Sequence, residues 1–320
     1  MVIWILLIII GFILLIKGAD FLVDGASNIA KKFHIPEIII GLTVVSIGTS
    51  MPELFVSITS AIDGYSDMAI GNIVGSNIAN LLLILGVSSI IRAIKFKRET
   101  RLIEIPLCLV LTLIFVALCN LGNDISRVDS IVLIVLFVLF IIYTIIMAKK
   151  GEEFDKEDEE NEKNDKVQTS KSTVRDVVFL ILGIAFLKFG GGLTVDNAVN
   201  IARHFSLSEK IISVTILAVG TSLPELVTSV SAAIKGKSDI AIGNIIGSNI
   251  FNMLLIIGIS AMIKPIAYNT SYNIDFIFVI IGTILLSLFP VIPPKNKMTR
   301  WNGIIFVYVY IMYMVSLFVK

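Results

Sequence analysis

Long apolar runs separated by short polar ones extend over almost the whole chain. A helix that crosses the hydrocarbon core of a bilayer needs about 20 mostly apolar residues. Ten segments fit this pattern: 1–16 (continuing to about residue 30), 38–62, 68–91, 102–119, 130–148, 177–195, 211–234, 240–263, 276–292 and 301–319. Because backbone polar groups in lipid must be satisfied within their own segment, the pattern predicts an all-α integral membrane protein with ten transmembrane helices.

The composition favours the same class of protein. Of 320 residues, 56% are hydrophobic and 16% are charged, with a mean hydropathy of +0.93, whereas soluble domains contain about 25% charged residues. This excludes a soluble enzyme, and a net charge of +1 offers no basic surface for nucleic acid. The first apolar segment lacks a basic start and a small-residue cleavage site, so we expect a membrane span and not a removable signal.

One long polar stretch, residues 149–175, separates a first five-helix unit, 1–148, from a second, 176–320. It contains nine carboxylates between Glu152 and Asp165, and like charges in such a run disfavour a compact structure. We expect a solvated tether, with a calcium-sensing role as the alternative.

The distribution of lysine and arginine predicts an orientation. The connections after the first, third, fifth, seventh and ninth spans hold 19 of the 26 basic residues, and the other connections with the tail hold 5. Because basic residues are enriched in cytoplasmic loops, the 149–175 linker is predicted to be cytoplasmic. Both termini are then extracellular, in a multi-pass protein of the cell membrane.

The chain contains an internal repeat. Shifted by 172 residues, 11–94 aligns with 183–266 without a gap, and 41–80 matches 213–252 at 23 of 40 positions. Each copy holds five predicted spans, an odd number, so the two copies enter the membrane from opposite sides. The inverted topology that follows is typical of secondary transporters, whose binding site lies near the midplane between the repeats.

Two glutamates, Glu53 and Glu225, are equivalent in the repeat and lie near the middle of their spans, after GTSMP and GTSLP. Proline removes a backbone donor and blocks the helix ladder, so the second and seventh helices are predicted to break just before each glutamate. Broken backbone at membrane depth is tolerated only where it lines a cavity or is buried in protein. The freed carbonyl groups would be candidate cation ligands, and they belong to Ser46 or Thr49 and to Ala218 or Thr221.

The paired carboxylates favour a hard cation. A single carboxylate at the middle of the membrane costs about 2.5–3.5 kcal/mol even on an insertion scale, and two that lie together repel unless they are protonated or neutralised. Oxygen ligands suit Ca²⁺ and Na⁺. No cysteine or histidine accompanies these motifs, and Cys108 and Cys119 lie within one apolar segment without metal-ligand spacing, which argues against Zn²⁺ and Cu⁺.

A second repeated motif is GNIVGSNIAN at residues 71–80, which matches GNIIGSNIFN at 243–252. We interpret its glycines, Gly71, Gly75, Gly243 and Gly247, as close helix-packing positions. Ser76 with Asn80, and Ser248 with Asn252, are four residues apart and share one helix face, where they could complete an oxygen shell opposite the glutamates. For Asn72 and Asn244 we favour helix–helix hydrogen bonding over direct coordination.

The two motif pairs, GTSMPEL with GNIVGSNIAN and GTSLPEL with GNIIGSNIFN, resemble the two α-repeats of the Ca²⁺/cation antiporter superfamily, and most closely its prokaryotic Na⁺/Ca²⁺ exchangers. The resemblance covers essentially the whole chain apart from the linker. It implies Na⁺-driven Ca²⁺ transport, typically of three Na⁺ for one Ca²⁺, with the first and sixth helices sliding across an eight-helix core. Gly18 and Gly190, with Ala19, Ala26 and Ala198, are small residues that suit such sliding.

The resemblance also implies a ligand set at the midplane for the transported ions, Ca²⁺ and Na⁺. Its glutamates are Glu53 and Glu225, and backbone oxygens come from the positions of Ser46 and Ala218. Side chains or carbonyls complete the set at Thr49, Ser50, Ser76 and Asn80, and at Thr221, Ser222, Ser248 and Asn252. We expect no catalytic residues and no resident cofactor. The expected partners are the ions and the lipid bilayer, with no nucleic acid and no obligate protein partner.

Charge arithmetic gives further expectations. Two carboxylates neutralise one Ca²⁺ but leave a net +1 with three Na⁺, so exchange at that stoichiometry is electrogenic. Branches that co-transport K⁺ carry aspartate at the position of Asn252, and asparagine there suggests K⁺ independence. Proton-coupled relatives typically have glutamate where Gly75 and Gly247 stand.

Three alternatives remain beside Na⁺/Ca²⁺ exchange. An H⁺/Ca²⁺ exchanger is the first, because a buried glutamate can trade a cation for a proton. A Ca²⁺-permeable channel would share the oxygen ligands but does not predict inverted broken-helix repeats. An intramembrane protease would need a nucleophile–base pair beside the glutamates, and the sequence places none there.

Overall fold

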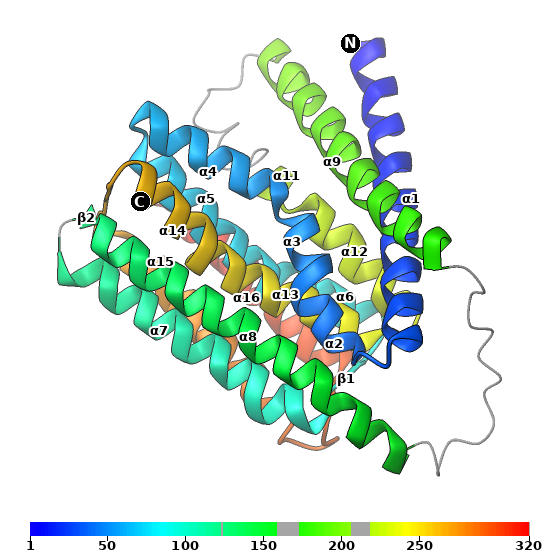
Figure 1. The fold of residues 1–320 in the computed structure, drawn as a ribbon. Helices are drawn as coiled ribbons and strands as arrows, with labels where there is room; N and C mark the ends of the chain where they lie inside the picture. Colours follow the sequence, from blue (N-terminus) through cyan, green and yellow to red (C-terminus); the bar gives the residue numbers. More distant parts are fainter. Residues whose placement is uncertain (123, 159–172, 206–217, 320) are drawn as a thin grey trace.

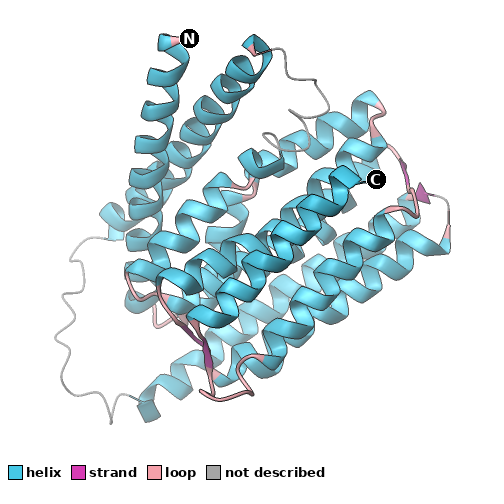
Figure 2. Ribbon diagram, turned by 180° about the vertical axis from the view of Figure 1, so that it is seen from behind, coloured by secondary structure: helices cyan, strands magenta, loops and turns pink. Residues whose placement is uncertain are grey.

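The computed structural model describes residues 1–122, 124–158, 173–205 and 218–319, and this part of the chain is almost entirely helical (Figures 1 and 2). The first half contains α1 (Val2–Lys32), α2 (Glu37–Ile40), η1 (Gly41–Val45), α3 (Ser46–Thr49), α4 (Met51–Asp63), α5 (Ser66–Ile78), η2 (Ala79–Ile84), α6 (Leu85–Ile91), η3 (Thr100–Glu104), α7 (Ile105–Leu121) and α8 (Arg127–Asp158). The second half contains α9 (Thr173–His204), α11 (Ala218–Thr221), α12 (Leu223–Ile234), α13 (Ser238–Phe251), η5 (Asn252–Ile256), α14 (Ile257–Ile263), α15 (Tyr272–Leu288) and α16 (Arg300–Val319). The all-α prediction is confirmed.

Helices occupy the ten positions expected from the hydropathy pattern, but they do not all meet a length criterion for membrane spans. Among the described residues, seven helices are long and apolar enough to cross a bilayer, and an eighth span results if the bent pair Glu37–Thr49 and Met51–Asp63 counts as one. The apolar helices α12 and α15 are shorter. Eight candidate spans are therefore observed, and the count of ten stays a prediction.

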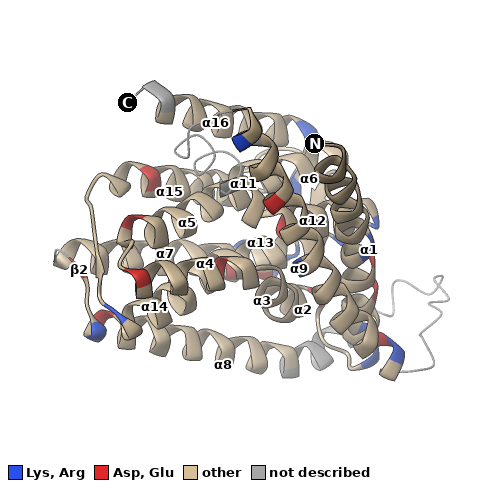
Figure 3. Ribbon diagram, turned by 90° about the horizontal axis from the view of Figure 1, so that it is seen from above, with Lys and Arg blue, Asp and Glu red and all other residues tan. Residues whose placement is uncertain are grey.

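The outer surface of the bundle is apolar. Large apolar side chains are exposed along α1, α8 and α16, for example Ile13, Val135 and Ile311, and Figure 3 shows long stretches of ribbon without charged residues. The centre, in contrast, is formed by α13, where every residue from Ile240 to Phe251 is buried. Exposed apolar surface over a helical core that contains polar groups is the pattern of a protein that spans a membrane.

Helices extend into both ends of the predicted linker, residues 149–175. Helix α8 continues ten residues beyond the expected span end at residue 148, to Asp158, and α9 already begins at Thr173. The rest of the 149–175 stretch lies outside the described residues.

Two short antiparallel strand pairs connect the halves of the chain. Strand β1 (Ile94–Lys95) pairs with β4 (Lys297–Met298), and β2 (Asp124–Ile125) pairs with β3 (Ile266–Ala267). The 172-residue shift relates β1 to β3 directly and places Ile125 at the position of Lys297. Each pair therefore joins the loop after the third predicted span of one half to the loop before the fifth span of the other.

Helices α1 and α9 lie side by side at one edge of the bundle (Figures 1 and 2). Their contact depends on glycines spaced seven residues apart. A Cβ atom at Gly18 would lie 3.0 Å from the carbonyl oxygen of Gly183, and one at Gly11 would lie 2.8 Å from that of Gly190. Glycine therefore permits the close backbone approach of the two helices. Gly18 and Gly190 belong to this contact, while Ala19 and Ala26 pack in an apolar cluster that includes Ala232 and Ile240.

Replacing Gly183 by valine is expected to destabilise the α1–α9 pair by about 1–3 kcal/mol, the usual cost of overpacking. A Cβ atom there would lie 2.7 Å from the backbone nitrogen of Leu22, which cannot move independently of α1. The melting temperature in detergent, followed by size-exclusion chromatography, should fall. Gly192→Val, on the same helix, is the control because, among the described residues, nothing lies within 4 Å of a Cβ atom at Gly192. Equal melting temperatures for the two variants would contradict the close backbone approach of α1 and α9.

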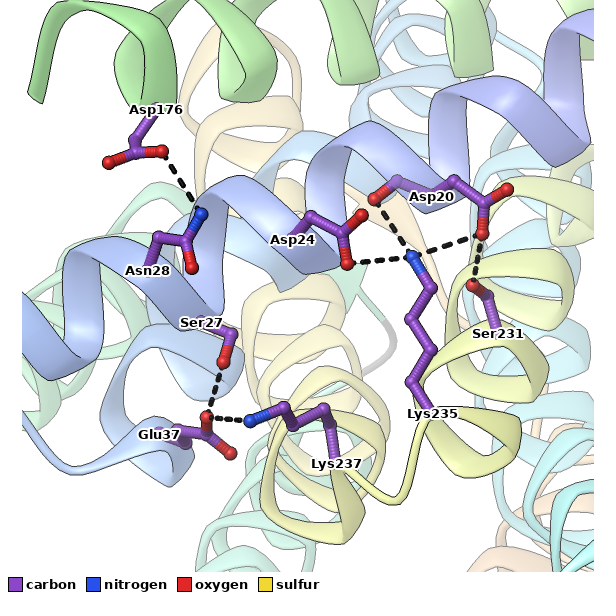
Figure 4. A network of polar contacts seen from close by, with 9 residues as sticks. All are labelled: Asp20, Asp24, Ser27, Asn28, Glu37, Asp176, Ser231, Lys235 and Lys237. Carbon is purple, nitrogen blue, oxygen red and sulfur yellow. Dashed lines mark hydrogen bonds and ion pairs between the residues drawn. The ribbon is translucent and has the colours of Figure 1, made fainter. Parts of the chain in front are cut away.

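A polar network fastens α1 to the bundle at one end (Figure 4). Lys235, which follows α12, lies 2.8 Å from Asp24 Oδ1 and 3.1 Å from Asp20 Oδ1, and it also donates to the carbonyl oxygen of Asp20. Ser231 donates to the same Asp20 oxygen at 3.0 Å.

Further along the same network, Lys237 lies 2.8 Å from Glu37 Oε1, which also accepts a hydrogen bond from Ser27 of α1 (Figure 4). Acidic and hydroxyl groups of α1 and α2 thus meet two lysines that flank the α12–α13 turn.

Candidate cation-binding site

The glutamates lie where two helices are interrupted. Helix α3 ends at Thr49 and α4 begins at Met51 after Ser50, with a bend of 51° between the segments. The second repeat has the same interruption at Ser222, between α11 and α12. Proline follows each break, in the first turn, where its missing N–H is tolerated. The predicted breaks are present, and both glutamates lie in first turns, where the helix dipole favours negative charge.

Both carboxylates are buried and face the opposite repeat. Glu53 and Glu225 are each 1% exposed. Ser50 donates a hydrogen bond of 2.7 Å to Glu225 Oε1, and Ser222 lies 3.4 Å from Glu53 Oε1 in the equivalent contact. Ser76 of α5 also donates to Glu53 Oε1, at 3.3 Å. Each glutamate therefore accepts a hydroxyl hydrogen bond from the helix break of the other half of the chain.

Asn72 and Asn244 form hydrogen bonds with residues at and near both helix breaks. Asn244 Nδ2 donates hydrogen bonds to Ser229 Oγ at 3.0 Å and to the carbonyl oxygen of Glu225 at 3.5 Å. Its Oδ1 accepts a hydrogen bond from Thr49 of the other repeat at 3.0 Å. Asn72 makes the corresponding contacts to Ser57, to the Glu53 carbonyl and to Thr221. The prediction of helix–helix hydrogen bonding for these two asparagines is confirmed.

Several oxygens of the predicted ligands are buried and have no hydrogen-bond partner. Within the part of the chain that the structure describes, they are Glu53 Oε2, Glu225 Oε2, Asn80 Oδ1, Asn252 Oδ1 and Ser248 Oγ. A buried acceptor without a partner costs about 1–3 kcal/mol, and more when it is charged. All five atoms are hard oxygen donors of the kind that bind hard cations.

The site has only two carboxylates. Among the described residues, no group of three or more histidine, cysteine, aspartate or glutamate side chains could hold a metal. The ion pairs described for lysine side chains do not involve Glu53 or Glu225. A cation at this place would therefore need the serine and asparagine oxygens in addition to Glu53 and Glu225.

The backbone ligands look different from the expectation. The carbonyl oxygen of Ser46 already accepts from the Ser50 nitrogen at 3.0 Å and from the Thr49 hydroxyl at 3.2 Å, so it is not free in this conformation. Ala218 is the first described residue of α11. The positions of both carbonyl groups as cation ligands stay predictions.

Glycine packing at the second motif is confirmed for Gly243 and Gly247. A Cβ atom at Gly243 would lie 2.7 Å from the carbonyl oxygen of Ile38, and one at Gly247 would lie 2.5 Å from that of Leu42. At Gly71 the nearest described atom would be the Tyr272 hydroxyl of α15, at 3.3 Å. The repeat counterpart of Leu42, position 214, lies outside the described residues, so the packing interpretation of Gly75 stays a prediction.

Two features of the site escaped the sequence analysis. Asn80 and Asn252 stand in π-helical turns, η2 and η5, where the wider winding displaces side chains relative to a regular α-helix. Asn77 and Asn249, buried one turn earlier, hydrogen-bond to them across the repeats. The identity of Asn77 and Asn249 in the alignment of the two halves was the available signal.

Comparisons with known proteins agree with this geometry. A sequence model of the family "Sodium/calcium exchanger protein" matches twice, over residues 3–146 and 176–319. The chain is 31% identical over 343 residues to "Sodium/calcium exchanger MaX1" of Methanosarcina acetivorans, covering 98% of each chain. It is 35% identical over 286 residues to "Inner membrane protein YrbG" of Escherichia coli, covering 87% of each. It is 37% identical over 259 residues to "Putative antiporter CaxA" of Alkalimonas amylolytica, covering 81% of this chain and 80% of that one.

Among solved structures, the sodium-calcium exchanger NCX_Mj, soaked with 2.5 mM Na⁺ and 0.1 mM Ca²⁺, superimposes with a TM-score of 0.83 at 31% identity. The match covers 99% of both chains.

Proposed function

Because this chain belongs to the sodium/calcium exchanger protein family, whose members are membrane transporters and not enzymes, we propose that it exchanges Na⁺ for Ca²⁺ by alternating access. The observation that carries the proposal is the pair of buried glutamates, each of which accepts a hydroxyl hydrogen bond from the helix break of the other half and keeps one oxygen without a hydrogen-bond partner. A dehydrated Ca²⁺ takes six to eight oxygen ligands, and carboxylate, amide and hydroxyl groups are the ones available here.

The proposed ligands are those that the sequence motifs indicated. They are Glu53 and Glu225 with Thr49, Ser50, Ser76, Asn80, Thr221, Ser222, Ser248 and Asn252, and the backbone oxygens of Ser46 and Ala218. Ca²⁺ and Na⁺ are transported substrates. The reciprocal contacts of Ser50 with Glu225 and of Ser222 with Glu53 support a single site shared by both halves.

The proposed topology has ten crossing helices in two inverted repeats. Under this proposal α12 and α15 also cross, both termini are extracellular, and the acidic linker is cytoplasmic. Three features support it: the five apolar segments in the sequence of each repeat, the basic residues that concentrate in alternate connections, and the family match to each half separately.

The coupling follows from charge. One Ca²⁺ between two carboxylates leaves no net charge, and three Na⁺ leave +1, so exchange at that ratio moves charge across the membrane. Asparagine at both Asn80 and Asn252 leaves no third carboxylate for K⁺. A glutamate at position 247 in the manner of proton-coupled relatives would not fit, since even a Cβ atom would collide with the Leu42 carbonyl.

The test is ⁴⁵Ca²⁺ uptake into proteoliposomes that contain the purified full-length chain. Vesicles loaded with Na⁺ and diluted into choline buffer without K⁺ should accumulate Ca²⁺, and vesicles loaded with choline should not. An inside-negative potential should change the rate if exchange is electrogenic. Uptake that ignores internal Na⁺ and follows an imposed pH gradient would overturn the sodium assignment in favour of H⁺/Ca²⁺ exchange. Uptake only when K⁺ is added would overturn the K⁺ independence.

A further inference from the structure

Four buried asparagines meet where the two repeats cross at the centre of the bundle. Asn77 Nδ2 donates to the main-chain carbonyl of Asn249 at 3.4 Å, and Asn249 Nδ2 donates to the main-chain carbonyl of Asn77 at 3.4 Å. Both side chains are completely buried. The contacts are reciprocal, and each residue stands 172 positions from its counterpart.

These contacts determine which way both amides point. A backbone carbonyl oxygen can only accept a hydrogen bond, so Asn77 and Asn249 must each present the amide nitrogen to it and turn Oδ1 away. The two Oδ1 atoms then accept from the next pair: Asn80 Nδ2 donates to Asn249 Oδ1 at 3.0 Å, and Asn252 Nδ2 donates to Asn77 Oδ1 at 3.0 Å.

These hydrogen bonds also fix the orientation of the Asn80 and Asn252 amides. An asparagine amide that directs its nitrogen to one side presents its oxygen to the other. The oxygens left over, Asn80 Oδ1 and Asn252 Oδ1, are two of the buried atoms without a hydrogen-bond partner. A rotated amide would instead present two N–H donors, which repel a cation.

We propose that Asn77 and Asn249 are positioning residues that fix Asn252 and Asn80 with their amide oxygens toward the transported cation. This inference rests on the proposed function and goes beyond the ligands named for it. Each positioning residue orients a ligand of the opposite repeat, so the two halves of the site are held in register with one another. The orientation of all four amides depends on the main-chain carbonyl groups of Asn77 and Asn249, because a carbonyl oxygen can only accept a hydrogen bond.

The same network restricts what position 252 can hold. Asn77 Oδ1 accepts a hydrogen bond from Asn252 Nδ2, and an ionised aspartate at 252 would place two acceptors against each other without a shared hydrogen, whereas a protonated one could donate. Asn77 cannot rotate to relieve this clash without losing its hydrogen bond to the Asn249 carbonyl. The network therefore disfavours a third ionised carboxylate at position 252.

The experiment is a mutant cycle between Asn249 and Asn80, measured as the KM for Ca²⁺ in Na⁺-driven uptake by the reconstituted full chain. In Asn249→Leu the new side chain has a similar volume but cannot accept the hydrogen bond from Asn80 Nδ2. Its KM should rise by about 10–100-fold, the usual effect of removing a group that orients a metal ligand, with a smaller change in maximal rate. Asn80→Ala should raise KM comparably, and the double variant should be no worse than Asn80→Ala alone. Asn77→Leu with Asn252→Ala forms the symmetric cycle.

Two further variants separate positioning from folding. Ser260→Ala removes a buried hydroxyl of α14 that has no hydrogen-bond partner, and it should leave KM unchanged. Asn249→Ala removes the same acceptor without adding volume and should raise KM to a similar extent, so it decides the question even if Asn249→Leu does not fold. Multiplying effects in the double variant, or an unchanged KM in Asn249→Leu or Asn249→Ala, would each overturn the proposal. Absence of Na⁺-driven uptake in the wild type would instead overturn the proposed function.

Discussion

Replacing Glu225 by glutamine is expected to abolish Na⁺-driven Ca²⁺ uptake, and Glu53→Gln should do the same. Each carboxylate is 1% exposed, so its charge interacts with a bound cation with little screening by water. Breaking a buried charge pair by removing one partner costs about 3–5 kcal/mol, which corresponds to a loss of about a hundredfold to a thousandfold or more in affinity. Initial rates of ⁴⁵Ca²⁺ uptake measured against Ca²⁺ concentration would show the loss.

Glu104→Gln is the matched control for the glutamate variants. Glu104 is also buried, at 2% exposed, and it lies within a helix, in η3, but outside the candidate site. The same chemical change there should keep uptake within about threefold of the wild type. Loss of uptake in Glu104→Gln together with unimpaired uptake in Glu225→Gln would reverse the assignment of the site.

Valine at Gly247 is expected to prevent correct folding. A Cβ atom at Gly247 would lie 2.5 Å from the carbonyl oxygen of Leu42 and 2.6 Å from the Ser46 hydroxyl. The Leu42 carbonyl is backbone, so relief requires separating α13 from η1 and α3. The penalty lies at the upper end of the overpacking range of about 1–3 kcal/mol, or above it.

The measurement is the yield of monodisperse protein in detergent and its melting temperature. Ile311→Val is the control, because Ile311 of α16 is 52% exposed on the outer surface of the bundle and such substitutions usually change stability by less than about 0.5 kcal/mol. A melting temperature of Gly247→Val equal to that of Ile311→Val would contradict the close approach of α13 to η1.

The sequence was sufficient for the principal elements of the fold. Apolar run length located helices at ten positions. Proline after GTS located the two breaks, because proline is tolerated in the first turn of a helix and not in its interior. The repeat alignment then singled out Glu53 and Glu225, since charge within an apolar span is costly and has to be offset. These are properties of residues and their neighbours in the chain.

Contacts between distant segments could not be read in the same way. That Ser50 donates to Glu225, while Ser222 approaches Glu53, depends on how the two repeats cross. The π-helical turns at Asn80 and Asn252 have no recognised signal in the sequence. The approach of Gly247 to the Leu42 carbonyl oxygen likewise depends on how α13 packs against η1, a contact between segments about 200 residues apart.

The lysine that fastens α1 also makes the two halves of the protein energetically unequal. The position equivalent to Lys235 is Asp63, and the positions equivalent to Asp20 and Asp24 are Gly192 and Asp196. The symmetry-related contact would therefore bring two acids together in place of a lysine and two acids.

In the proposed alternating-access cycle, a perfectly duplicated protein would have two degenerate end states. Lysine at position 235, where the other repeat has Asp63, lowers the free energy of the state in which α1 lies against α12 relative to the other end state. Asp24 is 51% exposed, and pairs of this kind contribute about 0.2–1 kcal/mol, comparable to thermal energy. The resting population is thus biased without being trapped, and ionic strength at that end of the bundle tunes the bias.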